Sequence, residues 1–297
     1  MVACQPPWAD SVVGPIEAAL PMNGPTQMKW LSSARMSGIH PVRVHPGVCI
    51  GSISCCGINK WGCAMNYDAM SEEVEVRAED ADFRLPGDLA VPERPIGVVL
   101  VAHGSGSSRF SRRNRAVAQR LYQGRLATLL FDLLTAEEHE IDQQTRQLRF
   151  DVSLLSDRLT AAVDWVHSES AVASLPIGLF GASTGAAAAM MTAWARPAAV
   201  RAIASRGGRT DLAADALPHV ETPTLLIVGG EDLPVVGMNR AAQRMLAGPA
   251  ELEIVPGASH LFEEPGALER AAELAATFFR EHLARSLQPE SATGAAS

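Results

Sequence analysis

Along residues 96–283, short apolar runs alternate with longer segments whose apolar residues recur at helical spacing. The runs predict buried strands, and most are followed by a segment that favours a helix. The predicted strands are 96–104, 127–134, 176–183, 200–205, 222–230 and 251–257, and the predicted helices are 113–124, 142–168, 184–195, 235–246 and 266–283. Such alternation predicts an α/β domain with a mostly parallel sheet and helices on both faces.

The ends of the chain differ from this alternating region. Residues 70–91 are typical of two strands around an acidic turn, whereas residues 1–69 show no sustained strand or helix period. We therefore expect an irregular or disordered extension over 1–69, the α/β domain over 70–285 and a flexible tail over 286–297. The segment 211–222 is too short for a cap, so we expect no large cap domain.

The sharpest chemical signal is the pentapeptide Gly181-Ala182-Ser183-Thr184-Gly185, between a predicted strand and a predicted helix. A serine at such a turn is strained so that its hydroxyl projects above the sheet as a nucleophile, and the flanking glycines avoid clashes. Small-residue pentapeptides also arise by chance, and the alternative is a plain turn before a packing helix. The helix amino terminus, which favours an oxyanion, supports the nucleophile interpretation.

Two partners for Ser183 follow in the order that a hydrolase triad of this kind requires, acid and then histidine. Asp232 lies just beyond a strand that ends in two glycines, and we expect it to orient the imidazole, although the adjacent Glu231 is an alternative. His260 lies on the loop between the last strand and the last helix, where we expect it to act as the base. His103 precedes the serine in the chain, and we interpret it as shaping its own loop.

The oxyanion hole of such a site needs two preorganised N–H donors. One is expected from the backbone of Thr184, the residue after the nucleophile. The second is expected from the loop His103-Gly104-Ser105-Gly106, with Ser105 as donor and Gly104 allowing the backbone to approach the substrate.

Arginines cluster on two loops that are expected at the same sheet edge as Ser183. Directly after the oxyanion loop come Arg109, Arg112, Arg113 and Arg115, and the loop after the strand beyond the nucleophile helix carries Arg206 and Arg209. A solvated surface cluster is the ordinary interpretation, but arginine matches carboxylate and phosphate groups with paired hydrogen bonds. We therefore predict that Arg109 and Arg209 bind an anionic group of the substrate.

Composition limits the alternatives. The formal net charge of −8 argues against nucleic-acid binding, and no apolar run is long enough to span a bilayer. The start of the sequence lacks the features of a secretory signal, so we expect a cytoplasmic protein. All five cysteines precede Met70 without zinc-site spacing, and no nucleotide motif is complete, so we expect neither a metal nor an organic cofactor.

Several motifs together resemble one known group: HGSGSSRFSRRNRAVA, GASTGAAAA, SRGGRTDLA, VGGEDLPVVGMNR and PGASHLFEEPGALE. Over residues 71–285 the chain is similar to the dienelactone-hydrolase-like branch of the α/β-hydrolases, including domains that occur alone or fused to phosphoribosyltransferases. The resemblance implies an eight-stranded α/β-hydrolase sheet and a triad of Ser183, Asp232 and His260. Dienelactone hydrolases proper carry a cysteine nucleophile, so Ser183 is a departure from them.

The residues and the resemblance together predict a serine hydrolase that cleaves a small ester or lactone through an acyl-enzyme. An acyltransferase on the same triad is one alternative, and it would differ in passing the acyl group to an alcohol. A non-catalytic binding protein of the hydrolase fold is the other, although such a protein would normally lack a triad member.

Overall fold

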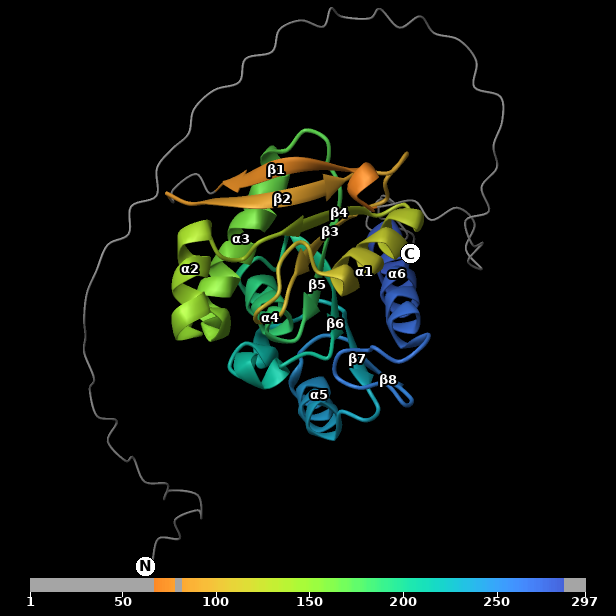
Figure 1. Cartoon of the computed structure of the whole chain (residues 1–297). Helices are drawn as coiled ribbons and strands as arrows, with labels where there is room; N and C mark the ends of the chain where they lie inside the picture. The colour runs from red at the N-terminus through yellow and green to blue at the C-terminus, as the bar shows by residue number, and fades with distance from the viewer. Residues whose placement is uncertain (1–66, 78–81, 286–297) are drawn as a thin grey trace, which may run out of the picture. The chain divides into compact units, whose positions relative to one another are not determined.

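The computed structural model describes residues 67–77 and 82–285, which contain one eight-stranded sheet in the order β1-β2-β4-β3-β5-β6-β7-β8 (Figure 1). Strands β1, β2 and β4 pair antiparallel, and every pair from β4 to β8 is parallel. The strands are β1 Ser71–Arg77, β2 Arg84–Ala90, β3 Val98–Ala102, β4 Ala127–Phe131, β5 Ile177–Ala182, β6 Val200–Arg206, β7 Thr224–Gly229 and β8 Ala250–Val255. The predicted α/β-hydrolase fold with a mostly parallel sheet is confirmed.

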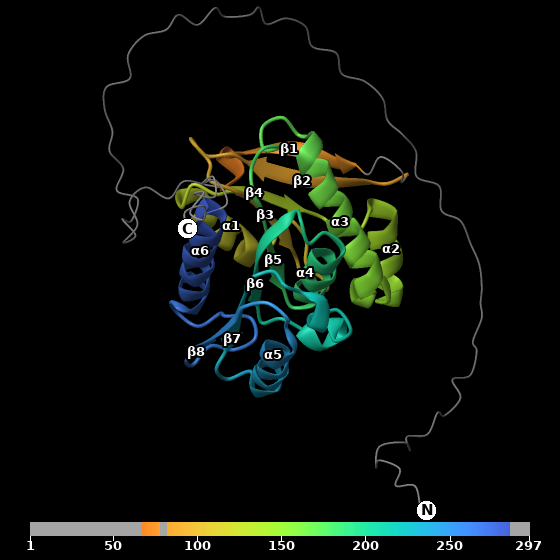
Figure 2. The same ribbon diagram turned by 180° about the vertical axis from the view of Figure 1, so that it is seen from behind.

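Helices cover both faces of this sheet. The α-helices are α1 Arg112–Gln123, α2 Ala136–Thr145, α3 Val152–Ser168, α4 Thr184–Ala195, α5 Leu233–Met245 and α6 Ala267–Arg285. Helices α1 and α6 pack together on one face, while α3 and α4 pack together on the other, and Figure 2 shows the same two layers from behind. Between β6 and β7 the chain forms only two short 3-10 helices, η3 Thr210–Ala213 and η4 Leu217–His219, so no large cap stands at that position.

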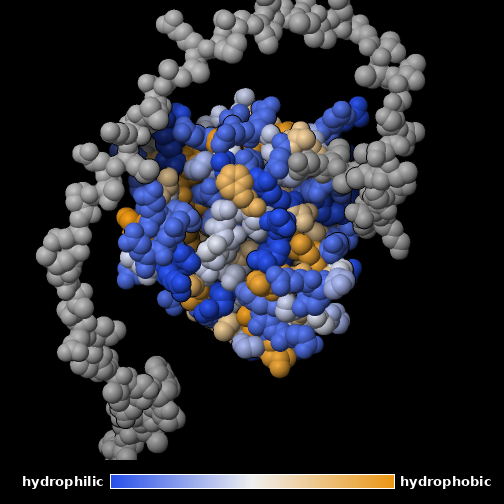
Figure 3. All heavy atoms as spheres, in the orientation of Figure 1, coloured by the Kyte–Doolittle hydropathy of each residue, from blue (hydrophilic) through white to orange (hydrophobic). Residues whose placement is uncertain are grey.

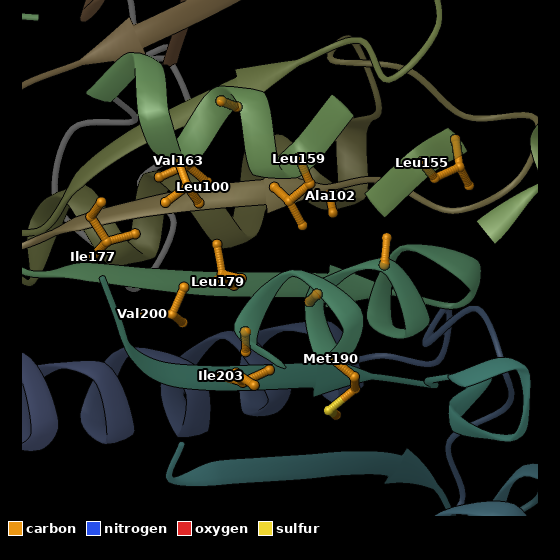
Figure 4. Packing of buried hydrophobic residues seen from close by; sticks show 14 of the residues in the cluster. Leu100, Ala102, Leu155, Leu159, Val163, Ile177, Leu179, Met190, Val200 and Ile203 are labelled. Carbon is orange, nitrogen blue, oxygen red and sulfur yellow. The ribbon is translucent and has the colours of Figure 1, made fainter. Parts of the chain in front are cut away.

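The central strands form because their residues are apolar throughout and can be buried on both faces. Every residue of β3, β4 and β5 is buried. Figure 4 shows one of the two core layers, in which Leu100 and Leu179 of neighbouring strands meet Leu159 and Val163 of α3. Each fully buried leucine or valine contributes about 1.5–3 kcal/mol to folding. Burial of the strands therefore fixes the positions of their ends, from which the polar loops begin.

One predicted helix is divided in the structure. Residues 142–168 were expected to form a single helix, but the chain forms α2, a short 3-10 helix η2 Leu148–Phe150, and α3. The division occurs at Arg146, which has a left-handed φ of 56°, and Asp151 then caps α3 by accepting from the Leu154 N–H. The buried carboxylate of Asp142 holds the connection by an ion pair of 2.6 Å with Arg149.

Three residues of the expected extension belong to the described domain. Tyr67–Ala69 form a 3-10 helix, η1, and Tyr67 is buried in the core layer beneath α1 and α6. Its hydroxyl lies 2.9 Å from the Thr128 hydroxyl, and burial raises the pKa of the Tyr67 phenol. Residues 1–66 and 286–297, which carry the rest of the predicted extension, all five cysteines and the predicted tail, lie outside the described residues.

The face seen in Figure 3 is mostly hydrophilic, with hydrophobic residues scattered in small groups between charged ones. The large apolar side chains that are exposed include Phe110 and Leu233. Within residues 67–77 and 82–285, none of the helices combines the length and the apolar character that crossing a membrane requires.

Burial of Tyr67 leads to a test of where the domain begins. In the full chain, Tyr67→Ala should lower the free energy of unfolding by about 3 kcal/mol, as truncation of a buried aromatic side chain does. Tyr67→Phe should cost about 1 kcal/mol, because the hydroxyl loses its hydrogen bond to Thr128 and a longer one, of 3.5 Å, to the Asp88 carbonyl oxygen. Chemical denaturation measures both values. Phe150→Ala is the matched control, since that ring is 53% exposed, and equal effects at the two positions would show that Tyr67 is not part of the core.

Candidate active site

The turn between β5 and α4 places Ser183 at the carboxyl edge of the sheet. Ser183 has φ 52° and ψ −117°, a conformation that L-residues seldom adopt. Both flanking glycines are required by contact: a Cβ on Gly181 would lie 2.4 Å from the Ala186 Cα, and one on Gly185 would lie 2.2 Å from the Ala102 carbonyl oxygen. The serine hydroxyl is thus held in the strained turn that the pentapeptide predicts.

The predicted acid and base are brought together beside this turn. His260, on the loop after β8, has its Nδ1 2.6 Å from Oδ2 of Asp232, the residue just before α5. Glu231, the alternative acid, is exposed, so the hydrogen bond to the imidazole is made by Asp232. The side chain of Asp232 is only 14% exposed, which strengthens a charge-assisted hydrogen bond.

Ser183 and His260 line the same cavity, whose volume is 210 Å³. No hydrogen bond joins these two side chains in the described part of the chain. Hydrogen bonds between a nucleophile and its base are often loose before substrate binds and tighten in the substrate complex. The arrangement therefore places the Ser183 hydroxyl and an imidazole held by Asp232 at one cavity.

The loop after β3 reaches this cavity as predicted for an oxyanion hole. A Cβ on Gly104 would lie 3.1 Å from the Ser183 Cβ, so only glycine lets the loop come this close without displacing the nucleophile turn. Ser105 lines the cavity, and Thr184 is the first residue of α4, where backbone N–H groups have no acceptor within the helix. The two predicted donors thus flank the serine, on the loop and on the helix.

His103 holds this loop in place. Its Nδ1 lies 3.0 Å from the Gly104 carbonyl oxygen, and its Nε2 accepts the Leu133 N–H at 3.2 Å. This pairing requires a neutral ring with the proton on Nδ1. Burial lowers the pKa of His103, with the Asp132 carboxylate acting in the opposite direction. His103 is therefore a positioning residue, as the sequence suggests.

Arg109 does not line the cavity of Ser183, because three carboxylates hold its guanidinium elsewhere. It lies 3.0 Å from Glu73, 3.2 Å from Asp88 and 3.6 Å from Asp132, and its side chain is only 11% exposed. Its backbone N–H also donates to Asp132 at 2.8 Å. These contacts anchor the end of the oxyanion loop to β1, to β2 and to the residue that follows β4.

Arg209 is likewise outside the lining of the cavity, and its guanidinium pairs with Asp211 at 2.8 Å. The positions of Arg109 and Arg209 therefore do not support their predicted role in substrate binding. Arg113 and Arg206 line the cavity in their place. Both belong to the arginine clusters expected at this edge of the sheet, although Arg206 is the last residue of β6 and not part of the loop that follows.

A second, larger cavity of 740 Å³ adjoins the first and shares Gly104, Ser105 and Ser107 with it. Its other wall includes residues of α2 and η2. The second cavity therefore leaves room on the far side of the oxyanion loop for a molecule longer than the first cavity.

Within residues 67–77 and 82–285, no group of three or more histidine, cysteine or carboxylate side chains is arranged to hold a metal ion.

Comparisons with known proteins identify the family and the fold. The model of the dienelactone hydrolase family matches residues 85–286. A crystal structure of a dienelactone hydrolase from Anabaena variabilis is 53% identical, with a TM-score of 0.69, and the match covers 72% of this chain and 99% of that one. Est1E from Butyrivibrio proteoclasticus, at 16% identity and a TM-score of 0.60, covers 71% of this chain and 99% of its own and shares the fold.

A curated protein of Mycobacterium tuberculosis that is named a phosphoribosyl transferase is 52% identical over 212 residues. The match takes in 71% of this chain but only 46% of that protein. The chain thus spans about half the length of the curated relatives that it matches.

The buried, neutral His103 makes a prediction about stability and pH. Its folded pKa is lowered below the ordinary value of 6.5, so the unfolded chain binds a proton more readily than the folded one. Above pH 6.5 its contribution is fully present, and below that value the free energy of unfolding should fall by up to about 1.4 kcal/mol per pH unit. Urea denaturation at pH 7.5, 6.5 and 5.5 should show this extra decline in the wild type and not in His103→Asn. Parallel curves for the two proteins would contradict the buried neutral state.

Proposed function

The chain belongs to the dienelactone hydrolase family, and we propose that it is a serine hydrolase that cleaves a small ester or lactone through Ser183, His260 and Asp232. The observation that carries the proposal is the junction at the carboxyl edge of the sheet. There the strained Ser183 turn and the Asp232-bound imidazole of His260 face one cavity.

The proposed reaction is acyl transfer from the substrate to water. The Ser183 hydroxyl attacks the carbonyl carbon while His260 Nε2 takes its proton, and the Thr184 and Ser105 amides stabilise the oxyanion. The alkoxide leaves with the proton held by His260, which gives an acyl-serine ester. Water then attacks this ester with His260 as base, and the acid is released as Ser183 regains its proton. For a lactone, the leaving alcohol stays tethered to the acyl group throughout, and the second step releases a single hydroxy acid.

The size of the site supports a small substrate. The cavity at Ser183 has a volume of 210 Å³, and its larger neighbour of 740 Å³ lies beyond the oxyanion loop. A drug-sized ligand normally occupies about 300–1,000 Å³. We therefore expect short acyl groups at the nucleophile, with any longer portion of the substrate extending into the adjoining cavity.

Replacing the proposed nucleophile should abolish ester hydrolysis without unfolding the protein. Ser183→Ala should lower kcat/KM for 4-nitrophenyl acetate by about 10⁴-fold or more, since triad members act as a unit. Asp232→Asn should lower it by about 10³- to 10⁴-fold, because the amide no longer holds the productive imidazole tautomer. Stopped-flow release of nitrophenol measures both.

Glu231→Gln is the matched control, because it neutralises the neighbouring exposed carboxylate and should retain wild-type activity. Incubation with EDTA should leave the rate unchanged. A Ser183→Ala enzyme as fast as the wild type, or activity that EDTA removes and zinc restores, would refute the proposal. Product analysis with methanol present distinguishes hydrolysis from acyl transfer to an alcohol.

A further inference from the structure

The loop between β6 and η3 touches both the nucleophile and the base of the proposed triad. Gly207 has a left-handed φ of 57°, and a Cβ on it would lie 3.4 Å from Cε1 and from Nδ1 of His260. Gly207 therefore borders the imidazole ring. Two residues further on, the Arg209 N–H donates to the Ser183 carbonyl oxygen at 3.1 Å. The peptide units on either side of Gly208 thus connect the support of His260 to the support of Ser183.

The middle of this loop is held by one side chain of α5. Asn239 is fully buried, and its Nδ2 donates to the Gly208 carbonyl oxygen at 2.8 Å and to the Val235 carbonyl oxygen at 2.9 Å. Both acceptors are carbonyl oxygens, so the amide has to present its NH₂ group to them. The bond to Val235 lies within α5, whereas the bond to Gly208 ties α5 to the loop.

The loop passes so close to its neighbours that residue 208 has to be glycine. A Cβ on Gly208 would collide with the Ser205 Oγ and would lie 2.8 Å from the Ala186 Cβ, on the nucleophile helix α4. Glycine has more backbone freedom than any other residue and has no side chain with which to restrict it. The hydrogen bond from Asn239 therefore restrains the residue of the loop that is least able to hold itself in place.

Helix α5 also carries the acid of the triad. Asp232 stands just before the first turn of this helix, and its carbonyl oxygen accepts the Val236 N–H at 2.9 Å. Asn239 lies about two turns further along the same helix. One helix thus restrains Asp232 directly and, through Asn239, the loop that borders His260 and contacts Ser183.

Burial alone gives no reason for an amide at position 239. The Oδ1 of Asn239 is buried and has no hydrogen-bond partner among the described residues. A buried polar atom without a partner destabilises the folded state, whereas an apolar side chain of similar size would carry no such cost. The interaction that distinguishes Asn239 from such a side chain and reaches beyond its own helix is the bond to Gly208.

We propose that Asn239 is a positioning residue of the triad, which holds the Gly208 carbonyl and thereby fixes the distance between Ser183 Oγ and His260 Nε2. This inference rests on the proposed function, because the loop affects catalysis only if these two side chains react together. Asn239 lines neither of the two cavities at the oxyanion loop, so it acts on alignment and not on substrate binding. A displacement of about 1 Å between reacting groups lowers a rate by about 100-fold.

Two substitutions remove the bond to Gly208 in different ways. Asn239→Leu keeps a similar volume and loses both donors, whereas Asn239→Ser is shorter and can still donate to the Val235 carbonyl within α5. With 4-nitrophenyl acetate, each should lower kcat about 10- to 100-fold and leave KM within about twofold of the wild type, because the groups that bind the substrate are unchanged. The rate constant for labelling of Ser183 by a fluorophosphonate should fall by a similar factor.

Gln243→Leu is the matched control on the same helix. The Gln243 Nε2 donates to the carbonyl oxygen of Ala250 at 3.1 Å. Ala250 is the first residue of β8 and lies at the opposite edge of the sheet from Ser183. This variant loses the same kind of bond and should keep the wild-type kcat. An equal loss of kcat in Gln243→Leu would show a general effect of weakening α5 and would overturn the proposal.

Hydrogen exchange followed by mass spectrometry tests the anchor without a substrate. Peptides that cover residues 206–210 should exchange about tenfold faster or more in both Asn239 variants than in the wild type and in Gln243→Leu, because the loop opens locally. Unchanged exchange in this segment would overturn the proposal, and so would a lower melting temperature with wild-type kcat in both variants. Esterase activity that survives in Ser183→Ala would instead refute the proposed function, and the exchange data would still show whether Asn239 holds the loop.

Discussion

The close approach of the β5–α4 turn to the end of β3 is the constraint on which the rest of the site depends. Gly185 stands where any Cβ would meet the Ala102 carbonyl at 2.2 Å, and Gly104 stands beside the Ser183 Cβ. The Ser183 conformation stores about 1–3 kcal/mol of strain. The turn persists because the Ser183 N–H donates to the Arg206 carbonyl, and the Ser183 carbonyl accepts from the Ala186 and Arg209 N–H groups. Parallel pairing of β3, β5 and β6 thus aims the nucleophile.

Polar contacts then hold the loop after β3, whose position the pairing of the strands alone does not determine. His103 bridges β3 and the segment after β4, and Arg109 joins three carboxylates from β1, β2 and that same segment. His103 is at the start of the oxyanion loop and Arg109 is at its end, so the loop is held at both ends. Arg206 differs from these groups, since its charge is enclosed but not matched within the described residues.

Much of this arrangement could be predicted from the sequence. The alternation of apolar runs with segments of helical period predicts the sheet and its helices, and Ser183, Asp232 and His260 follow one another in the order that the fold requires. The first part of helix α2 was missed because Ala136–Thr145 is mostly polar, with Ile141 as its one large apolar residue, although Thr135 and Glu138 form a capping box at its start. The role predicted for Arg109 and Arg209 stays a prediction, and neither side chain lines the cavity of Ser183. Loop position shows which edge of the sheet a residue occupies, but the carboxylates that hold Arg109 come from strands far away in the chain. Tyr67 was missed because a single buried aromatic residue has no periodicity.

The central claim is that the strained serine at the β5–α4 junction is the nucleophile, and covalent labelling tests it most directly. The full-length protein is treated with a fluorophosphonate and analysed by intact-protein and peptide mass spectrometry. We predict a single adduct, located on Ser183, which forms faster than on any other serine and is prevented by a competing ester substrate. An unlabelled protein that still hydrolyses the ester, or an adduct on another residue with Ser183 unmodified, would contradict the account.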